Sequence, residues 1–434
     1  MPSKKPLPTV STPPAVSLKS ASSERPAATL ERRVLDNGVV ILADYRPGMS
    51  SVALNLTFAI GNRHEPHELG GITHFVEHVV FKGTRKRDLN QIAKEINEQG
   101  GFFNASTGND SMRLETRVIS EDVPAALDLM LDLALNSTFP KREVERERGV
   151  ILEEISEYRD SPEDLCFDEW LRTLWAPNPL GSSILGEPET IERLKASELK
   201  EWLERLQHPE QMIVSIAGNF QSEHLAELTK RMSKLKPKGA RIPDALKAEG
   251  QGNSLRIQRP LEQVQFCLGH EGPSRNHPGR IAAQLGDIIL GGGMGSRLFN
   301  EIREKRGLAY TIASTYYGMR KEGYFLIYGS TLPEKHQEVV SICREECAKF
   351  AEEGPTEEEL RTAKLQFTRL ILLSQDNPST FASRNSDREV YQSEHLSDTQ
   401  LLDSIRTVTQ EEVVKVCRTI FRSPFASTLV GPLD

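Results

Sequence analysis

Two histidines and a glutamate in the segment Gly70–His78 have the types and spacing that metal chemistry requires. On a helix, His74 and His78 project from one face one turn apart, and both imidazoles can reach a single Zn²⁺ at about 2.0–2.1 Å. Glu77 precedes the second histidine, where a general base can take a proton from zinc-bound water. Thr73 can cap a helix that begins here. The alternative is a surface helix that carries these residues without any metal.

A catalytic zinc usually has three protein ligands and one open position for water. The acid-rich stretch 143–157 lies downstream of the histidines and offers several carboxylates for the third position. Most acids on such a helix face solvent. Residue type alone does not choose among the candidates, which are Glu147, Glu153, Glu154 and Glu157.

The run GGITHFVEHVVFKGT at 70–84, together with ERGVILEE at 147–154, resembles the inverted zinc motif of the pitrilysin/insulinase family, the inverzincins. That family includes the β subunit of the mitochondrial processing peptidase. The resemblance implies that Glu154 is the third zinc ligand, because it lies at the family's spacing from His78. It also implies that Glu147 supports the site by orienting the ligands.

The segment Gly100–Ala105 is similar to an edge strand of this family whose Asn-Ala pair contacts extended substrate. The resemblance makes Asn104 and Ala105 candidate substrate-binding residues. Without it, the interpretation is an ordinary turn followed by a strand, with Asn104 in the turn. The chain departs from the family at 112–114, Met-Arg-Leu, where relatives often carry an aromatic residue. The side-chain preference for substrate therefore stays open.

Arg303 and Tyr310 resemble an arginine–tyrosine pair that the family's second domain contributes to the active site. The resemblance implies that Tyr310 donates to the developing oxyanion and that Arg303 holds a substrate carbonyl. Arg306 is a rival for the role of the arginine. The glycine run 291–295 lacks the pattern of a phosphate-binding P-loop and is typical of a tight turn.

Hydropathy patterns predict the elements that must position these residues. Runs of β-branched and alternating residues predict strands at 39–45, 51–60, 212–217, 264–269, 310–317 and 324–329. Apolar residues at helical spacing predict helices at 88–97, 123–134, 141–158, 197–206, 281–290 and 297–303. Cys343 and Cys347 stand one helical turn apart and are expected to be small apolar residues on a helix face.

The second half of the chain repeats the plan of the first. Residues 194–218 and 408–431 each read as a helix followed by a strand, over nearly equal lengths. This match indicates duplicated α+β domains, with chance similarity as the alternative. The resemblance implies the same α+β fold class: two homologous domains, each an antiparallel sheet with helices packed on one side, which form half of a clamshell chamber.

The length of 434 residues predicts two folded domains. Residues 1–30 are rich in proline, serine and threonine and are predicted to be a disordered extension. The zinc-binding catalytic domain is expected at 31–234 and the homologous second domain at 254–434. Between them, 235–253 is rich in glycine, proline and charge without periodicity, which is typical of a linker.

The composition argues against several classes of function. A net charge of −8 does not give the basic surface that nonspecific nucleic-acid binding needs, and no apolar run approaches the ~18–20 residues that span a bilayer. Five scattered cysteines show no disulfide framework, which favours a reducing compartment, the cytoplasm. Residues 1–30 contain one acid, so an organellar matrix is the alternative if they act as a transit peptide.

The motif and the resemblance together predict a zinc metalloendopeptidase with one Zn²⁺ per chain and extended or unfolded peptides as substrates. By resemblance to the short members of the family, a chain of this length is half of a chamber, so a homodimer is expected. A heterodimer with an inactive homologue is the alternative. Two rival functions are a noncatalytic structural subunit and a processing peptidase subunit that requires a partner chain. Structural relatives typically lose ligands, and this chain keeps all three ligands and the base.

Overall fold

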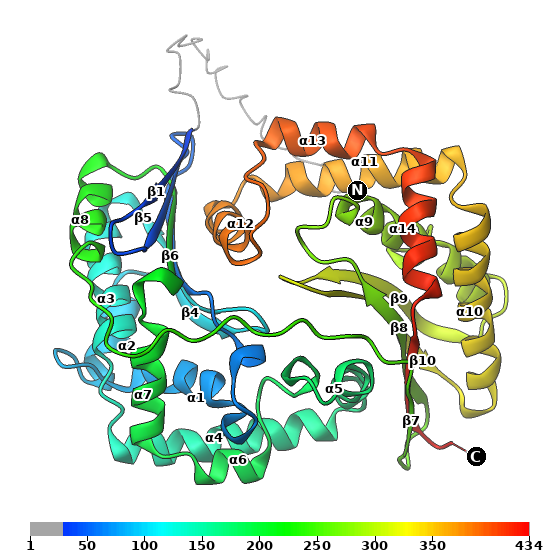
Figure 1. Ribbon diagram of the computed structural model, residues 1–434, viewed down its shortest axis with the longest axis horizontal. Helices are drawn as coiled ribbons and strands as arrows, with labels where there is room; N and C mark the ends of the chain where they lie inside the picture. Colours follow the sequence, from blue (N-terminus) through cyan, green and yellow to red (C-terminus); the bar gives the residue numbers. More distant parts are fainter. Residues whose placement is uncertain (1–28, 434) are drawn as a thin grey trace, which may run out of the picture.

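The computed structural model describes residues 29–433 and contains two β-sheets, one from each half of the chain (Figure 1). The two halves stand side by side, and each carries many of its helices on the side away from the other half. Residues 1–28, which make up most of the predicted disordered extension, lie outside the described residues. No helix between residues 29 and 433 is both long and apolar enough to cross a membrane.

The first sheet has six strands, and most neighbours in it run antiparallel. In spatial order they are β1 (Thr29–Val34), β2 (Val40–Tyr45), β6 (Met212–Gly218), β3 (Ser51–Phe58), β5 (Met112–Ile119) and β4 (Phe102–Thr107). β2 and β6 run parallel. β4 pairs with β5 at the edge of the sheet, so the backbone groups along its other side are free to pair with a further strand.

The second sheet has five strands, which follow the order of the first. They are β7 (Ser254–Gln258), β11 (Phe425–Gly431), β8 (Val264–Gly272), β10 (Gly323–Thr331) and β9 (Ala309–Gly318). Apart from β1, the sheets match strand for strand, and β7 and β11 repeat the parallel pairing of β2 and β6. The last strand of each half takes the same place: β6 lies between β2 and β3, and β11 lies between β7 and β8. This shared topology confirms the predicted duplication and the α+β class.

Amphipathic helices cover these sheets. The first half contains α1 (Ile72–Val79), α2 (Leu89–Glu98), α3 (Val123–Asn136), α4 (Lys141–Asp160), α5 (Pro162–Trp175), α6 (Pro188–Arg193), α7 (Ala196–Leu206) and α8 (Ser222–Met232). The second contains α9 (Arg280–Gly291), α10 (His336–Glu353), α11 (Glu357–Ser374), α12 (Pro378–Val390), α13 (Asp398–Thr407) and α14 (Gln410–Arg422). Cys343 and Cys347 on α10 are buried in the second core, which confirms their interpretation as small apolar residues.

Each half also sends one helix to the sheet of the other half. α5 packs on β8 and β11, where the Trp170 indole donates to the carbonyl of Ala426 at 3.2 Å. α12 packs on β3 and β6, where Phe381 contacts Ala53 and Ala217. Both helices lie between the two sheets in Figure 1. The expectation of helices on one side of each sheet therefore holds only for the outer faces, because a helix from the other half covers the inner ones.

Residues 235–253 contain no helix or strand and run along both halves. Arg63 of the first half donates to the carbonyl of Leu246 at 3.1 Å, and the amide of Ala248 donates to Glu322 of the second half at 2.5 Å. Buried side chains from both halves therefore hold this segment in place.

The predicted elements agree with the structure apart from shifts of a few residues and two differences. Thr29 and Leu30, assigned by prediction to the disordered extension, belong to β1 and pair with Tyr45 and Asp44. The predicted helix at 297–303 is helical over 297–304, but its residues Phe299–Glu304 form a π-helix in place of an α-helix.

Candidate metal centre

The first turn of α1, which carries His74, is held by Glu65, a residue that precedes the helix. α1 begins after Gly71, which has a left-handed backbone with φ 86°. The Glu65 carboxylate accepts hydrogen bonds from the amides of Gly71 at 2.7 Å and Thr73 at 2.8 Å. The prediction that Thr73 caps this helix is wrong, because Thr73 lies inside the first turn and its hydroxyl accepts a hydrogen bond from Trp202. Burial raises the pKa of Glu65 to about 7, although the hydrogen bonds to it act in the opposite direction.

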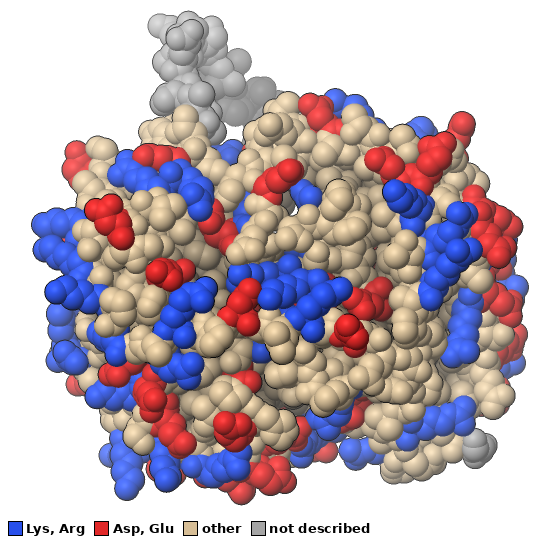
Figure 2. All heavy atoms as spheres, viewed as in Figure 1, with Lys and Arg blue, Asp and Glu red and all other residues tan. Residues whose placement is uncertain are grey.

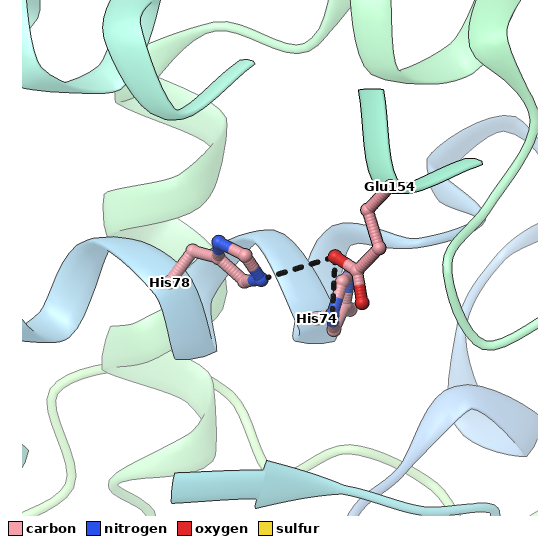
Figure 3. A group of neighbouring side chains, drawn as sticks. All are labelled: His74, His78 and Glu154. Atoms are coloured by element: carbon pink, nitrogen blue, oxygen red, sulfur yellow. Dashed lines mark ion pairs between the residues drawn. The ribbon is translucent and has the colours of Figure 1, made fainter. Parts of the chain in front are cut away.

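α1 and α4 bring three ligand-type side chains together (Figure 3). The Nε2 atoms of His74 and His78 lie 3.7 and 3.5 Å from the same carboxylate oxygen of Glu154. Two ligands of one tetrahedral zinc ion, each about 2.0–2.1 Å from the metal, are roughly 3.3 Å apart. The cluster therefore has the donor set and spacing of a zinc site, and it is the one group of metal-ligand type found between residues 29 and 433.

The pKa shifts of two of the three side chains, His74 and Glu154, suit metal ligands. Burial lowers the pKa of His78, but the contacts of His78 with Glu154, Glu77 and Glu147 outweigh burial, and its pKa is raised. Burial lowers the pKa of His74 to about 4, and the neighbouring His78 adds to this effect, so the imidazole is neutral at pH 7. The pKa of Glu154 is lowered, chiefly by its contact with His78, so this carboxylate is ionised. Neutral imidazoles and ionised carboxylates are the forms that coordinate metals.

Glu147 lies behind His78, two turns from Glu154 on the same face of α4. Its carboxylate is buried, 3.4 Å from Nδ1 of His78 and 3.0 Å from Nζ of Lys82. Such a carboxylate fixes the orientation of a ligand imidazole. Lys82, which the sequence reasoning missed, neutralises it; no local pattern marks this lysine, because its partner is far along the chain.

The other acids of α4 do not join the cluster. Glu153 and Glu157 are exposed to solvent and are not part of the metal-ligand cluster. Of the four carboxylates that residue type left open, the structure brings Glu154 and Glu147 to the histidines.

Glu77 is a residue of α1, the helix that packs against the edge strand β4. Burial raises the pKa of its carboxyl group, while Thr107, the last residue of β4, partly offsets this shift. The base candidate therefore lies near the end of the open edge strand β4.

Asn104 and Ala105 lie on β4, the open edge of the first sheet. Asn104 is exposed and Ala105 is buried, because successive side chains of a strand point to opposite faces. The turn interpretation of Asn104 is wrong, since the residue pairs with Glu115 inside the β4–β5 ladder.

Arg303 and Tyr310 contact each other but not the histidine cluster. The Arg303 guanidinium lies 4.7 Å from the centre of the Tyr310 ring and donates to the Tyr310 carbonyl at 3.0 Å. Tyr310 is 76% exposed on the edge strand β9. Within residues 29–433, no hydrogen bond or ion pair connects this pair with His74, His78, Glu77 or Glu154. The rival Arg306 is paired with Glu301 instead.

The surface charge is mixed. On the face shown in Figure 2, acidic and basic side chains alternate over both halves, without a broad area of one sign. This distribution agrees with the modest net charge of −8. The face in view does not have the continuous basic stripe of a nucleic-acid interface.

Comparisons with known proteins show the family to which the sequence is similar. Residues 40–188 match the family model described as insulinase (peptidase family M16), and residues 193–367 match that of the peptidase M16 inactive domain. An uncharacterized zinc protease of Rickettsia felis is 33% identical over 92% of this chain and 97% of its own length. The uncharacterized zinc protease YmxG of Bacillus subtilis is 30% identical over 93% and 98%.

Two solved structures share the fold. A protease from Helicobacter pylori superimposes with a TM-score of 0.86 and covers 93% of this chain and 100% of its own, at 22% identity. A peptidase M16 inactive domain from Pseudomonas fluorescens also has a TM-score of 0.86, covering 94% and 98% at 22% identity.

Proposed function

The chain belongs to the insulinase family of peptidases, peptidase family M16, and on that premise we propose that it is a zinc-dependent endopeptidase acting on extended or unfolded peptides. The observation that carries the proposal is the convergence of His74, His78 and Glu154 on one point. Relatives with zinc protease names support the choice of metal.

His74, His78 and Glu154 would hold one Zn²⁺ per chain, which when bound polarises a substrate carbonyl and lowers the pKa of water toward 7. The Glu77 carboxylate accepts a proton from the water that attacks the peptide bond and passes this proton to the leaving amine. Glu147 keeps the His78 ring in one orientation through Nδ1. The chain thus contributes one base, three ligand side chains and one orienting carboxylate.

The edge strand β4 would bind the substrate backbone. A peptide that adds to this edge must be extended, because only an extended backbone can form the main-chain hydrogen bonds of a paired strand. Asn104 and Ala105 would contact it along the strand, beside Glu77. This mode of binding selects unfolded segments over folded proteins.

We propose a homodimer in which Arg303 and Tyr310 act on substrate held by a second copy of the chain. The support is their position, on an exposed edge and without contact to the histidine cluster in the described residues. Tyr310 would donate to the developing oxyanion and Arg303 would hold a carbonyl. Five free, buried cysteines support a reducing compartment such as the cytoplasm.

Glu77→Gln tests the mechanism. The variant should keep zinc, as measured by elemental analysis, while cleavage of a peptide library followed by mass spectrometry falls about 10²–10⁴-fold because the base is lost. Glu68→Gln, an exposed glutamate before the same helix, is the control and should cleave normally. Turnover at the wild-type rate in Glu77→Gln would exclude Glu77 as the base. Absence of zinc from the wild-type protein would favour a structural subunit instead.

A further inference from the structure

A cavity outside the candidate metal centre is lined by four arginines. It lies among α9, α11, α12 and the segment before α13, has a volume of about 220 Å³, and shares no residue with the metal-ligand cluster. Its arginines are Arg275, Arg280, Arg384 and Arg388. We refer to it as the arginine pocket.

The arginine pocket carries excess positive charge. Asp387 and Glu394 are the two carboxylates in its lining, and Asp387 is already paired with Arg113 of β5. Arg384 is paired with Asp398. Within residues 29–433, the guanidinium groups of Arg275, Arg280 and Arg388 form no ion pair and no hydrogen bond.

Arg388 is the most informative of these residues, because its side chain is buried. The residue is 8% exposed and lines the cavity, without a partner among the described residues. The nearby Asp44 is bonded to Arg46 and Asn385 instead. Burial lowers the pKa of Arg388 to about 10, and the neighbouring Arg384 adds to the shift. Asp398 is also near Arg388 but is paired with Arg46 and Arg384. A buried charge without a direct ion-pair partner is costly, so a position like that of Arg388 can accommodate a further anion.

Part of the pocket lining is an apolar wall. Phe367 and Ile371 of α11 and Leu401 of α13 belong to it. A ligand that satisfies both walls has an anionic group at one end and an aliphatic or aromatic group at the other. The volume is below the roughly 300–1,000 Å³ of sites for drug-sized molecules, which limits the occupant to a small group.

We propose that the arginine pocket binds the carboxylate of a small ligand with an apolar side group, either a free organic acid or the C-terminal residue of a peptide. Guanidinium groups bind carboxylates bidentately, and Arg280 of α9 and Arg388 of α12 both line the pocket. An inorganic phosphate satisfies the arginines but leaves the apolar wall without a partner.

The test is calorimetric titration of the full chain with 4-methylpentanoate at low salt, with its neutral amide as the matched probe. The acid should bind and the amide should not, because the two differ in charge but hardly in shape. The titration is repeated with a chelator present, since a carboxylate can also bind zinc. Binding that survives the chelator supports the arginine pocket, and binding that the chelator abolishes overturns the proposal.

Two variants locate the site. Arg388→Met and Arg280→Met should each weaken binding of the acid at least about tenfold, the usual effect of losing a charge-assisted bond. Arg361→Met, at an exposed arginine of α11, should leave it unchanged. If Arg388→Met does not fold, as judged by circular dichroism, Arg280→Met carries the test, because Arg280 is only partly buried. Unchanged affinity in Arg280→Met, or equal binding of acid and amide, overturns the proposal.

The source of the carboxylate is decided with the peptide Ala-Ala-Leu and its C-terminal amide, titrated into Glu77→Gln so that the peptide stays intact. Binding of the peptide acid but not the peptide amide identifies a chain end as the occupant. Binding of 4-methylpentanoate alone identifies a free organic acid. Either result supports a carboxylate site, and binding of neither acid overturns it.

Discussion

Glu147 contacts a ligand-type side chain without being one itself, so its supporting role can be tested separately from that of the ligands. The carboxylate contacts His78 and Lys82 but is not one of the three clustered ligand-type side chains. Glu147→Gln keeps the size of the side chain but removes the charge that orients the imidazole. We expect zinc affinity to fall roughly 10–100-fold, measured by competition with a chromogenic chelator.

The matched control for this prediction is Glu153→Gln on the same helix. Glu153 is exposed, so the zinc affinity of the Glu153→Gln variant should equal that of the wild type. Equal affinities for all three proteins would mean that Glu147 serves only to neutralise Lys82.

The residues of the candidate site were predictable to different degrees. His74, Glu77 and His78 are predictable from their spacing within five consecutive residues of a helix. Glu154 and Glu147 needed the resemblance, because α4 approaches α1 only after folding. Glu65 and Lys82 were missed, since their partners are fixed by tertiary contacts that leave no pattern in the sequence.

At the level of elements, the start of α1 depends on one buried carboxyl group. Glu65 accepts hydrogen bonds from two amides of the first turn, and its folded-state pKa is raised to about 7 from 4.5. Between pH 4.5 and 7 the unfolded chain releases this proton while the folded chain keeps it. The contribution of Glu65 to the free energy of unfolding is therefore complete below pH 4.5 and is lost as the pH rises through 7, by up to ~3 kcal/mol.

Glu65→Gln should remove this dependence, because an amide does not ionise. We expect the difference in unfolding free energy between wild type and variant, measured in urea at pH 5 and pH 8, to shift in favour of the variant at pH 8. Glu68→Gln, an exposed neighbour, should run parallel to the wild type. A constant difference between wild type and Glu65→Gln at both pH values would mean that Glu65 is ionised in the folded protein throughout this range.

The elements themselves were largely predictable, and their exchange between halves was not. Periodicity of two or 3.6 marks a strand or helix from its own residues, as for α3 and β6. Neither α5 nor α12 was among the predicted helices, and no local pattern indicates the sheet on which each of them packs. The choice is made by contacts such as Trp170 with Ala426, between segments far apart in the chain.

For the whole molecule, a buried ion triad joins the two halves. Arg63 contacts Asp110 at 3.1 Å and Glu322 at 2.8 Å, and all three side chains are almost fully buried. Glu322 also binds the amide of Ala248 in the 235–253 segment. Arg63→Met leaves two buried carboxylates facing each other. The variant should lose about 3–5 kcal/mol of unfolding free energy in urea denaturation.

A second substitution checks that the loss comes from the uncompensated charge. Adding Asp110→Asn to Arg63→Met should restore part of the stability, because it removes one of the two opposed carboxylates. Arg361→Met at the surface should change stability little. Additive losses in the double variant would mean that packing around Arg63, rather than charge, stabilises this junction.

The separation of Arg303 and Tyr310 from the histidine cluster predicts how two copies of the chain share their active sites. A Glu77→Gln chain lacks the base but keeps the arginine–tyrosine pair, whereas a Tyr310→Phe chain has the opposite defect. If the pair acts on the partner's substrate, a mixed dimer contains one site with every wild-type group. Random mixing should then restore about a quarter of wild-type activity, because half of the dimers are mixed and each has one intact site of two.

The same experiment distinguishes action within one chain from action between chains. If Tyr310 served the histidines of its own chain, each site in a mixed dimer would have one defect and activity would stay at the level of the unmixed variants. Denaturing and refolding the two chains together provides the mixed dimers, and separate refolding provides the control. Size-exclusion chromatography coupled to light scattering measures the assembly, and a monomer that is fully active would contradict both the dimer and the shared site.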